Sequence, residues 1–155
     1  MVTVSSSRFE AKSRGEKPPD ESGDVASAAV KRAGHTVAKR ELVSDERSMI
    51  ENQVREFLSG DADVLVLMGG TGVSRRDVTI EAARPFFEKE LEGFGELLRF
   101  FSLRQVGVAA VATRATAGVA GGKLIVCLPG SPHAVRLAMK RFMGEFPHLL
   151  LVARS

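Results

Sequence analysis

The segment that most restricts the fold of this chain is a short apolar run, Val64–Met68, which stops at the glycine-rich segment 69–72. Consecutive apolar residues without alternating polar positions predict a strand that is buried on both faces, as the strands of parallel sheets are. The segment Lys123–Leu128 repeats this pattern and stops at a second turn, 129–132. Helices must then cover both faces of the sheet that holds these strands, which predicts an α/β fold.

Small and apolar residues with helical spacing separate and follow these strands. Helices are predicted from an N-cap at Ser22 to Gly34, from Ser44 to Gly60, over Thr79–Glu90 and Phe94–Leu103, and over His133–Met143 after an N-cap at Ser131. Strands are predicted at Met1–Val4, Thr36–Val43 and His148–Val152, and Ser5–Glu21 is predicted to be a loop. Residues 106–112 fit a strand or a helix. The pattern predicts one domain, residues 1–155, with three layers: a mostly parallel sheet between two layers of helices.

Composition excludes several classes of protein. With 155 residues, of which 44% are apolar, the chain is long enough for one compact core and unlike a disordered tail. The single cysteine, Cys127, excludes a disulfide framework and a metal site built from cysteines, which predicts a reducing, cytoplasmic location. No apolar segment approaches the roughly 20 residues of a membrane span, and no signal-like segment is expected. Tryptophan and tyrosine are absent, so a surface that stacks nucleic-acid bases is not expected.

The two turns after the buried strands are the first candidates for a binding site. In open α/β sheets, ligands bind beyond the carboxyl ends of the strands. Glycines in the turn 69–72 let backbone N–H groups approach a ligand, and the turn 129–132 leads into a helix whose N-terminus favours an anion. For either turn alone, a purely structural role stays open. The spacing matches neither a P-loop nor a dinucleotide-binding motif, so the pair predicts a phosphate cleft of another type.

Two carboxylates follow strands at the same expected edge of the sheet. Asp45 follows the strand 36–43, and Asp77 lies shortly after the turn 69–72. Each could cap the helix that follows or hold Mg²⁺ over the phosphates of a ligand. Arg75 and Arg76 could bind phosphate or lie on the solvated surface. The histidines lack the spacing of a metal site and are interpreted as structural.

An ordered set of short motifs resembles the MoaB/Mog family of molybdenum cofactor biosynthesis. The set comprises Asp20-Glu21-Ser22-Gly23, Ser44-Asp45-Glu46, Gly69-Gly70-Thr71-Gly72, Arg76-Asp77-Val78-Thr79 with Glu81, Gly93-Phe94 with Arg99 and Ser102, Ala117-Gly118, and Leu128-Pro129-Gly130-Ser131-Pro132. These motifs extend over essentially the whole chain. The resemblance implies the molybdopterin-binding α/β fold and assembly into a trimer or a hexamer.

The resemblance also implies an activity and a set of site residues. Active members of the family are molybdopterin adenylyltransferases, in which the terminal phosphate of molybdopterin attacks the α-phosphate of Mg·ATP and releases pyrophosphate. Asp45 and Asp77 match the two acidic positions assigned to catalysis and to Mg²⁺. The matching substrate-binding positions are Gly69, Gly70, Thr71 and Gly72 in the phosphate loop, and Ser102, Gly130, Ser131 and Pro132 around the pterin. Implied partners are molybdopterin, ATP, further copies of the chain and a downstream metal-insertion protein.

Two positions depart from the family's pattern. Ser6 stands where an acidic residue is common, and Ser44 replaces the usual proline before Asp45. The first departure removes a possible contact to the nucleotide or the metal, and the second changes the stiffness of a loop. Three functions stay open: transfer of AMP to molybdopterin in a molybdenum or tungsten pathway, pterin binding without catalysis, and regulatory nucleotide binding.

Overall fold

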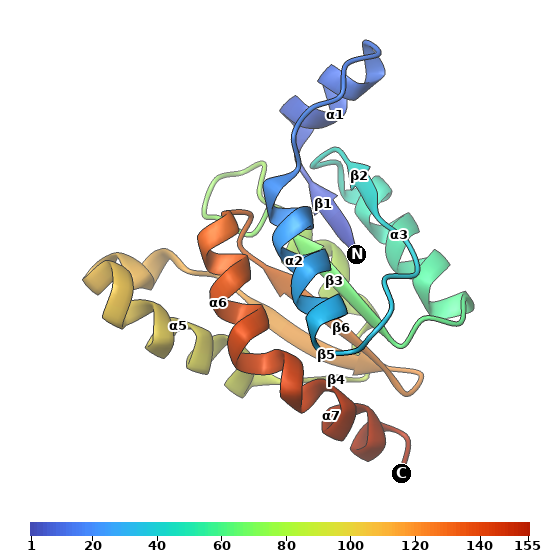
Figure 1. Ribbon diagram of the computed structural model, residues 1–155, viewed down its shortest axis with the longest axis vertical. Coiled ribbons are helices and arrows are strands. Elements are labelled where there is room, and N and C mark those ends of the chain that lie inside the picture. Colours follow the sequence, from blue (N-terminus) through green and yellow to red (C-terminus); the bar gives the residue numbers. More distant parts are fainter.

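The computed structural model describes residues 1–155 and contains one six-stranded sheet (Figure 1). The helices and strands, in chain order, are β1 (Val2–Val4), α1 (Ser6–Ser13), α2 (Glu21–Arg32), β2 (Glu41–Val43), α3 (Arg47–Ser59), β3 (Val64–Met68), α4 (Thr79–Ala83), β4 (Lys89–Glu90), α5 (Glu92–Val106), β5 (Thr116–Ala120), β6 (Lys123–Leu128), α6 (Pro132–Phe142) and α7 (Phe146–Ala153). The strand order is β2-β1-β3-β6-β5-β4. The four neighbours β2, β1, β3 and β6 are parallel, and β5 runs antiparallel to both β6 and β4. This topology confirms the predicted mostly parallel sheet.

Alternating side chains of the central strands fill two cores, one on each face of the sheet. In β6, Leu124, Val126 and Leu128 lie in one core, and Ile125 and Cys127 lie in the other. Residues of α2, α5, α6 and α7 cover the first core, and residues of α3 and α4 cover the second. In Figure 1, α2 and α6 lie side by side in front of the sheet. The structure therefore confirms the three-layer α/β fold.

The elements that carry the two predicted turns have the bounds that the sequence indicates. β3 and β6 begin and end at the predicted residues. α6 begins at Pro132, and the Oγ atom of its N-cap, Ser131, accepts a hydrogen bond from the N–H of Ala134 at 3.1 Å. The two runs are only 5 and 6 residues long and end in glycine-containing turns, which favours strands over helices and explains the agreement.

The predicted N-cap of α2 is wrong. Asp20, instead of Ser22, caps this helix, since its carboxylate accepts a hydrogen bond from the N–H of Gly23 at 3.1 Å. The hydroxyl group of Ser22 instead donates to the carbonyl of Gly130 at 2.6 Å. Ser22 therefore joins α2 to the turn after β6.

Three predicted elements differ in type from the structure. The helix predicted over Thr79–Glu90 ends at Ala83, because Pro85 in the following 3₁₀ turn lacks the N–H that an α-helix needs, and the segment then forms β4. His148–Val152 belongs to α7 and not to a strand; Pro147 stands near the start of that helix, where proline is favoured. Ser5–Glu21 is not all loop, because its first half forms α1.

Two further segments are settled by the structure. The strand predicted over Thr36–Val43 is restricted to β2, Glu41–Val43. In the ambiguous segment 106–112, Val106 ends α5 and Gly107–Ala112 form a 3₁₀ helix. None of the helices combines the length and the apolar character that a membrane span requires.

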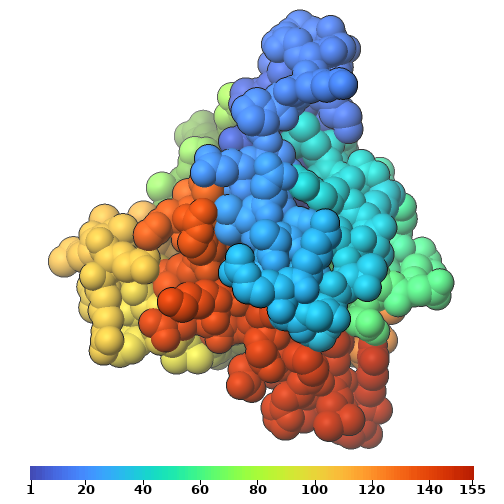
Figure 2. Space-filling model, in the orientation of Figure 1, coloured from blue at the N-terminus to red at the C-terminus, as the bar shows by residue number.

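α1 projects from the body of the protein beyond the ends of β1 and β2 (Figures 1 and 2). Ala11 is its only buried residue, which explains why the apolar pattern gave no sign of a helix. The position of α1 matters for function, because its first turn lies at the carboxyl end of the parallel strands.

Candidate functional site

The parallel neighbours β3 and β6 end at the same level of the sheet. Met68 pairs with Leu128, and the N–H of Gly69 donates a hydrogen bond to the carbonyl of Leu128 at 3.0 Å. The two turns that follow touch each other. A Cβ atom at position 130 would lie 3.0 Å from the Cα of Gly69, so glycine at 130 permits this contact. The structure thus brings the two predicted turns together.

The carbonyl groups of the turn after β3 are held from outside the turn. Thr79 Oγ1 donates to the carbonyl of Gly69 at 2.7 Å, and the N–H of Thr79 donates to the carbonyl of Gly70 at 2.9 Å. Nη1 of Arg114 donates to the carbonyl of Gly72 at 2.7 Å. Gly69 and Gly70 have φ angles of +103° and +63°, which glycine adopts without strain. This side of the turn is therefore fixed.

The N–H groups of the same region are free. Those of Gly70, Thr71 and Gly72 have no hydrogen-bond acceptor within the chain, and neither do those of Gly130 and Ser131. The N-terminus of α6 adds its partial positive charge at the second turn. Free N–H groups from two touching turns, next to a helix N-terminus, are typical of an anion-binding site.

A cavity of about 480 Å³ lies at these two turns. All the predicted site residues except Asp45 and Pro132 line it. The lining residues among them are Gly69, Gly70, Thr71, Gly72, Asp77, Ser102, Gly130 and Ser131. Ser102 reaches the cavity from α5 and is buried. The structure therefore gathers both turns, one residue of α5 and one of the two aspartates at a single cavity. The binding roles of these residues stay predictions.

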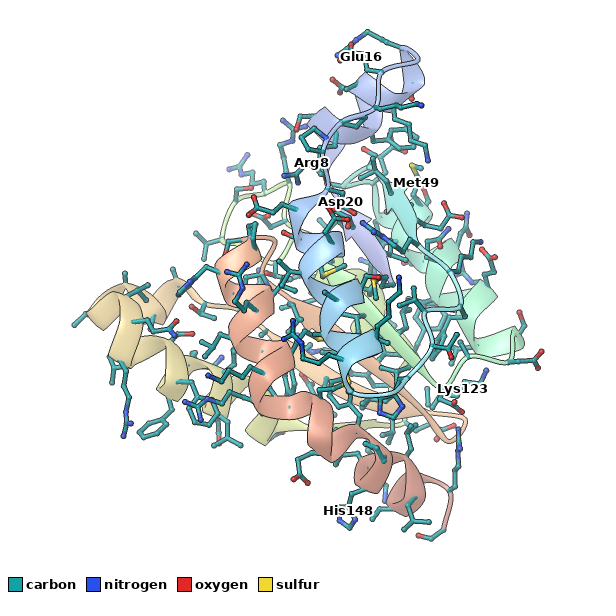
Figure 3. The ribbon with its side chains drawn as sticks, viewed as in Figure 1. Arg8, Glu16, Asp20, Met49, Lys123 and His148 are labelled. Carbon is teal, nitrogen blue, oxygen red and sulfur yellow. The ribbon has the colours of Figure 1, made fainter.

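Two arginines that line the cavity were missed by the sequence reasoning. Arg8 comes from α1, and Figure 3 shows it at the end of the sheet from which α1 projects. Arg114 precedes β5, and its Nη2 pairs with Glu81. Recognition of α1 as a helix after the first strand would have placed Arg8 at the cleft. No sequence pattern indicates that Arg114 lies at the cavity, because the strand that follows it was not predicted.

His133 also lines the cavity, although the histidines are interpreted as structural. Its Nε2 lies 2.6 Å from Oε1 of Gln105, another lining residue. This contact joins the first turn of α6 to the end of α5. Gln105 and His133 therefore add two polar side chains to this wall of the cavity.

Asp77 lines the cavity and does not cap α4. Its Oδ2 accepts a hydrogen bond from the N–H of Ser74 at 2.9 Å, which closes the loop 74–77. The N-cap of α4 is Val78, without a side-chain bond. Oδ1 of Asp77 has no hydrogen-bond partner in the chain. One carboxylate oxygen is therefore free beside the turn 69–72.

Asp45 lies outside the lining of the cavity, at the ends of β1 and β2. Its carboxylate accepts a hydrogen bond from Ser6 Oγ, and its Oδ2 lies 3.3 Å from Nε of Arg76. Asp45 does not cap α3, whose N-cap is Glu46. Because Arg76 precedes Asp77 in the chain, the two aspartates are joined through the loop after β3.

The chain alone offers no complete metal site. No group of three or more His, Cys, Asp or Glu side chains is placed to hold a metal ion. Mg²⁺ is commonly bound through one or two carboxylates together with substrate phosphates and water. The free oxygen of Asp77 fits such a partial ligand set. Asp45 fits it once its ion pair with Arg76 is broken.

Cys127 is the only thiol and lies fully buried in β6. Burial raises the pKa of this thiol to about 12. The thiol therefore stays protonated at neutral pH and does not act as a nucleophile. The interpretation of Cys127 as a core residue is confirmed.

Comparison with known proteins extends over nearly the whole chain. Residues 1–148 match a family described as "Probable molybdopterin binding domain". A Staphylococcus aureus protein named Molybdenum cofactor biosynthesis protein B is 47% identical over 111 residues, which are 70% of this chain and 66%, just under two thirds, of that protein. A Bacillus anthracis protein of the same name is 41% identical over 152 residues, 96% of this chain and 86% of that protein. The crystal structure of the tungsten cofactor synthesizing protein MoaB from Pyrococcus furiosus superimposes with a TM-score of 0.85 at 36% identity, over 99% of this chain and 94% of that one.

Proposed function

Because this chain belongs to the MoaB/Mog family of molybdenum cofactor biosynthesis proteins, we propose that it is a molybdopterin adenylyltransferase. In this reaction a terminal phosphate oxygen of molybdopterin attacks the α-phosphorus of ATP. A new P–O bond forms, the bond between the α-phosphorus and the bridging oxygen breaks, and pyrophosphate leaves. The products are adenylylated molybdopterin and pyrophosphate.

The observation that carries this proposal is the set of free N–H groups at the cavity. The N–H groups of Gly70, Thr71, Gly72, Gly130 and Ser131 have no acceptor in the chain, and all five residues line the cavity. Gly70, Thr71 and Gly72 are buried or half-buried, and such backbone donors are rarely left unpaired unless water or a ligand accepts from them. Gly130 and Ser131 are exposed, so their N–H groups are open to a ligand. Phosphate oxygens are acceptors only, so both substrates of the proposed reaction supply the missing partners.

The charged side chains of the cavity suit the same ligands. Arg8 and Arg114 stand on its wall and can neutralise phosphate charge, while Arg114 also holds the turn through Gly72. Transfer between phosphates depends mainly on positioning and charge neutralisation. No protein nucleophile is required, which agrees with the protonated thiol of Cys127.

The two aspartates have different proposed tasks. The free oxygen of Asp77 would hold Mg²⁺ over the phosphates at the turn 69–72. When bound, the metal ion neutralises charge on the pyrophosphate that leaves. Asp45 would join Asp77 after a phosphate group takes over its partner Arg76, since arginine pairs well with phosphate. Substrate binding would thus free the Oδ2 atom of Asp45 from its ion pair with Arg76.

The test is formation of adenylylated molybdopterin and pyrophosphate by the purified protein from molybdopterin and Mg·ATP. Product formed by the unmodified chain and lost without Mg²⁺ supports the proposal. Molybdopterin binding without product would contradict it and favour a pterin carrier. Tight ATP binding without affinity for molybdopterin would favour regulatory nucleotide binding.

Parallel metal-insertion assays with molybdate and tungstate would then decide which metal the pathway uses.

We further propose that copies of this chain associate through the outer face of α5 and the 3₁₀ turn after it. This face carries six of the large apolar side chains that are exposed: Leu97, Phe100, Leu103, Val106, Val108 and Val111. Figure 2 shows the segment, in yellow, standing out from the body of the protein. Exposed apolar patches of this kind mark interaction sites. The resemblance implies a trimer or a hexamer, and the same segment contributes Val106 to the cavity.

Light scattering during size-exclusion chromatography measures this association. Leu103→Asp is expected to release monomers, because the charge would be buried in the interface. Val73→Asp is the matched control: Val73 is an exposed apolar residue outside this face, so its variant should keep the oligomer. If the unmodified protein is a monomer, the proposed interface is wrong, but the proposed reaction is not affected.

A further inference from the structure

Ser6, Asp45 and Arg76 follow three neighbouring strands, β1, β2 and β3. Val4 pairs with Val43, and the N–H of Ser5 donates to the carbonyl of Val43 at 2.9 Å. The ends of β1 and β2 are therefore held in register. This register places Ser6, the first residue of α1, beside the segment 44–45.

The hydroxyl group of Ser6 has three partners. Its Oγ lies 2.8 Å from Oγ of Ser44 and 3.1 Å from the backbone nitrogen of Asp45, and it also contacts the carboxylate of Asp45. A serine hydroxyl has one hydrogen to donate and two positions that accept. The carboxylate can only accept, so it receives the hydrogen of Ser6. The N–H of Asp45 then takes one acceptor position, and the hydroxyl of Ser44 must donate to the other.

The direction of donation is thereby determined, from Ser44 to Ser6 and from Ser6 to the carboxylate of Asp45. Ser44 is buried, with 7% exposed, which protects this chain of hydrogen bonds from competing water. A hydrogen bond from a hydroxyl to a carboxylate is stronger than one between neutral groups. Every donor and acceptor position of Ser6 is occupied, so its side chain has no second orientation that keeps all three contacts.

Asp45 has only one other side-chain partner. Its Oδ2 faces Nε of Arg76, but the side chain of Arg76 is 74% exposed. Ion pairs with exposed partners contribute little and fix a side chain weakly. The orientation of Asp45 therefore depends on Ser6.

We propose that Ser6 is a positioning residue that orients the carboxylate of Asp45 for the reaction; this inference rests on the proposed function of Asp45 in AMP transfer. An ionised acidic side chain at position 6 has no hydrogen to donate and would repel the carboxylate of Asp45. Serine does what an acidic residue cannot: it holds Asp45 in one orientation, also after Arg76 has left Asp45 to pair with a phosphate. The serine at position 6, which departs from the family's pattern, therefore serves the reaction at this site.

Steady-state kinetics of the variants Ser6→Ala, Ser6→Thr and Ser6→Asp test the proposal. Ser6→Ala should lower kcat by about tenfold or more, with little change in KM for molybdopterin, because orientation is lost while the cavity is intact. Ser6→Thr keeps the hydroxyl group and should restore most of the rate. Ser6→Asp should be as slow as Ser6→Ala. Ser7→Ala is the matched control, since Ser7 is an exposed neighbour on α1 that contacts only Ser5.

Hydrogen exchange of the backbone N–H of Asp45 gives a second measurement that does not need turnover. This N–H donates to Ser6 Oγ, so its exchange should become faster in Ser6→Ala and stay slow in Ser6→Thr. A Ser6→Ala variant with the unmodified kcat and exchange rate would overturn the proposal, and so would a Ser6→Asp variant that is faster than the unmodified protein. If the unmodified chain forms no product, the proposed function fails. The exchange rates then still decide whether Ser6 orients Asp45.

Discussion

The parallel centre of the sheet and its antiparallel edge use similar polar groups in opposite ways. At the ends of β3 and β6, the backbone N–H groups of five residues lack an acceptor in the chain, and all five residues line a cavity. At the edge formed by β4 and β5, Thr116 Oγ1 donates to Oε1 of Glu90 at 2.6 Å, and Arg84 pairs with the same carboxylate at 2.9 Å. The first region keeps its hydrogen-bonding capacity for a ligand, whereas the second uses it within the chain.

The comparison separates the residues that stabilise the fold from those that serve the site. Two buried threonines illustrate the difference, because the hydroxyl group of each donates one hydrogen bond. Thr79 donates to the carbonyl of Gly69, and Thr116 donates to the carboxylate of Glu90. Thr79 shapes a turn that lines the cavity. Thr116 is not a lining residue, and its hydrogen bond ties β5 to the edge strand β4. Changes in the first region should therefore affect ligands and activity, and changes in the second should affect stability alone.

The largest effect is expected for Asp77→Asn, which removes the negative charge from the cavity but keeps an oxygen that can accept from Ser74. Turnover of Mg·ATP with molybdopterin should fall by about a hundredfold or more. The thermal midpoint should change little. Pyrophosphate release measures the rate, and Asp61→Asn is the control, because Asp61 is exposed and outside the cavity at β3 and β6. An Asp77→Asn variant with normal turnover would remove Asp77 from the proposed mechanism.

Gly130→Ala should separate the two turns that now touch. The added Cβ would lie 3.0 Å from the Cα of Gly69, so one turn must shift. We expect a loss of about 1–3 kcal/mol in the free energy of unfolding, as for other overpacked positions, together with weaker ATP binding. Urea denaturation and isothermal titration calorimetry measure the two effects. In the control, Gly144→Ala, the added Cβ meets no atom within 4 Å, and neither quantity should fall.

Thr79→Val and Thr116→Val form a matched pair. Each removes one buried hydrogen-bond donor and should cost about 1–2 kcal/mol in the free energy of unfolding. Only Thr79→Val should also weaken ATP binding, because the turn after β3 loses the contact that fixes the carbonyl of Gly69. Equal ATP affinity in the two variants would show that the comparison between the two regions is wrong.

The smallest effect is expected for Glu90→Gln at the antiparallel edge. Hydrogen bonds from Arg84 and Thr116 hold the pKa of Glu90 below its ordinary value of 4.5. A carboxyl whose pKa is lower in the folded protein stabilises the fold above pH 4.5, and this contribution disappears as the pH falls through the folded pKa. Because Arg84 is half exposed, the contribution at pH 7 is about 1 kcal/mol or less. Denaturation of both proteins should show a difference in the free energy of unfolding at pH 7 that becomes smaller as the pH is lowered to 3, with unchanged turnover at pH 7.

The sequence predicted the elements around the two turns better than it predicted the edges of the fold. β3, β6 and the cap at Ser131 follow from short-range rules, since a run buried on both faces and a Ser-Pro pair leave few alternatives. The clustering of the two turns then follows from parallel topology. Arg8 and Arg114 could not be found in this way, because their positions depend on α1 and on the pairing of β5 with β6.

The wrong predictions share a physical cause. α1 buries only Ala11, so no apolar periodicity marks it. α7 is an apolar segment in which a helix and a strand have similar local patterns, and packing of Phe146 into the core of α2 and α6 decides between them. The cluster of Ser6 with Asp45 also lies beyond local patterns, because it depends on the register of β1 with β2.

Because Cys127 is buried, its reactivity reports how often the centre of the sheet opens. The only thiol of the chain lies in β6, paired with Leu67 of β3 and Thr116 of β5, and is 0% exposed. A thiol reagent can reach it only when the central strands separate, and its pKa of about 12 makes it unreactive until then. The rate of alkylation therefore measures how often the centre of the sheet opens. Slower alkylation in the presence of ATP would report binding at the turns through the strands that carry them, without any label added to the protein.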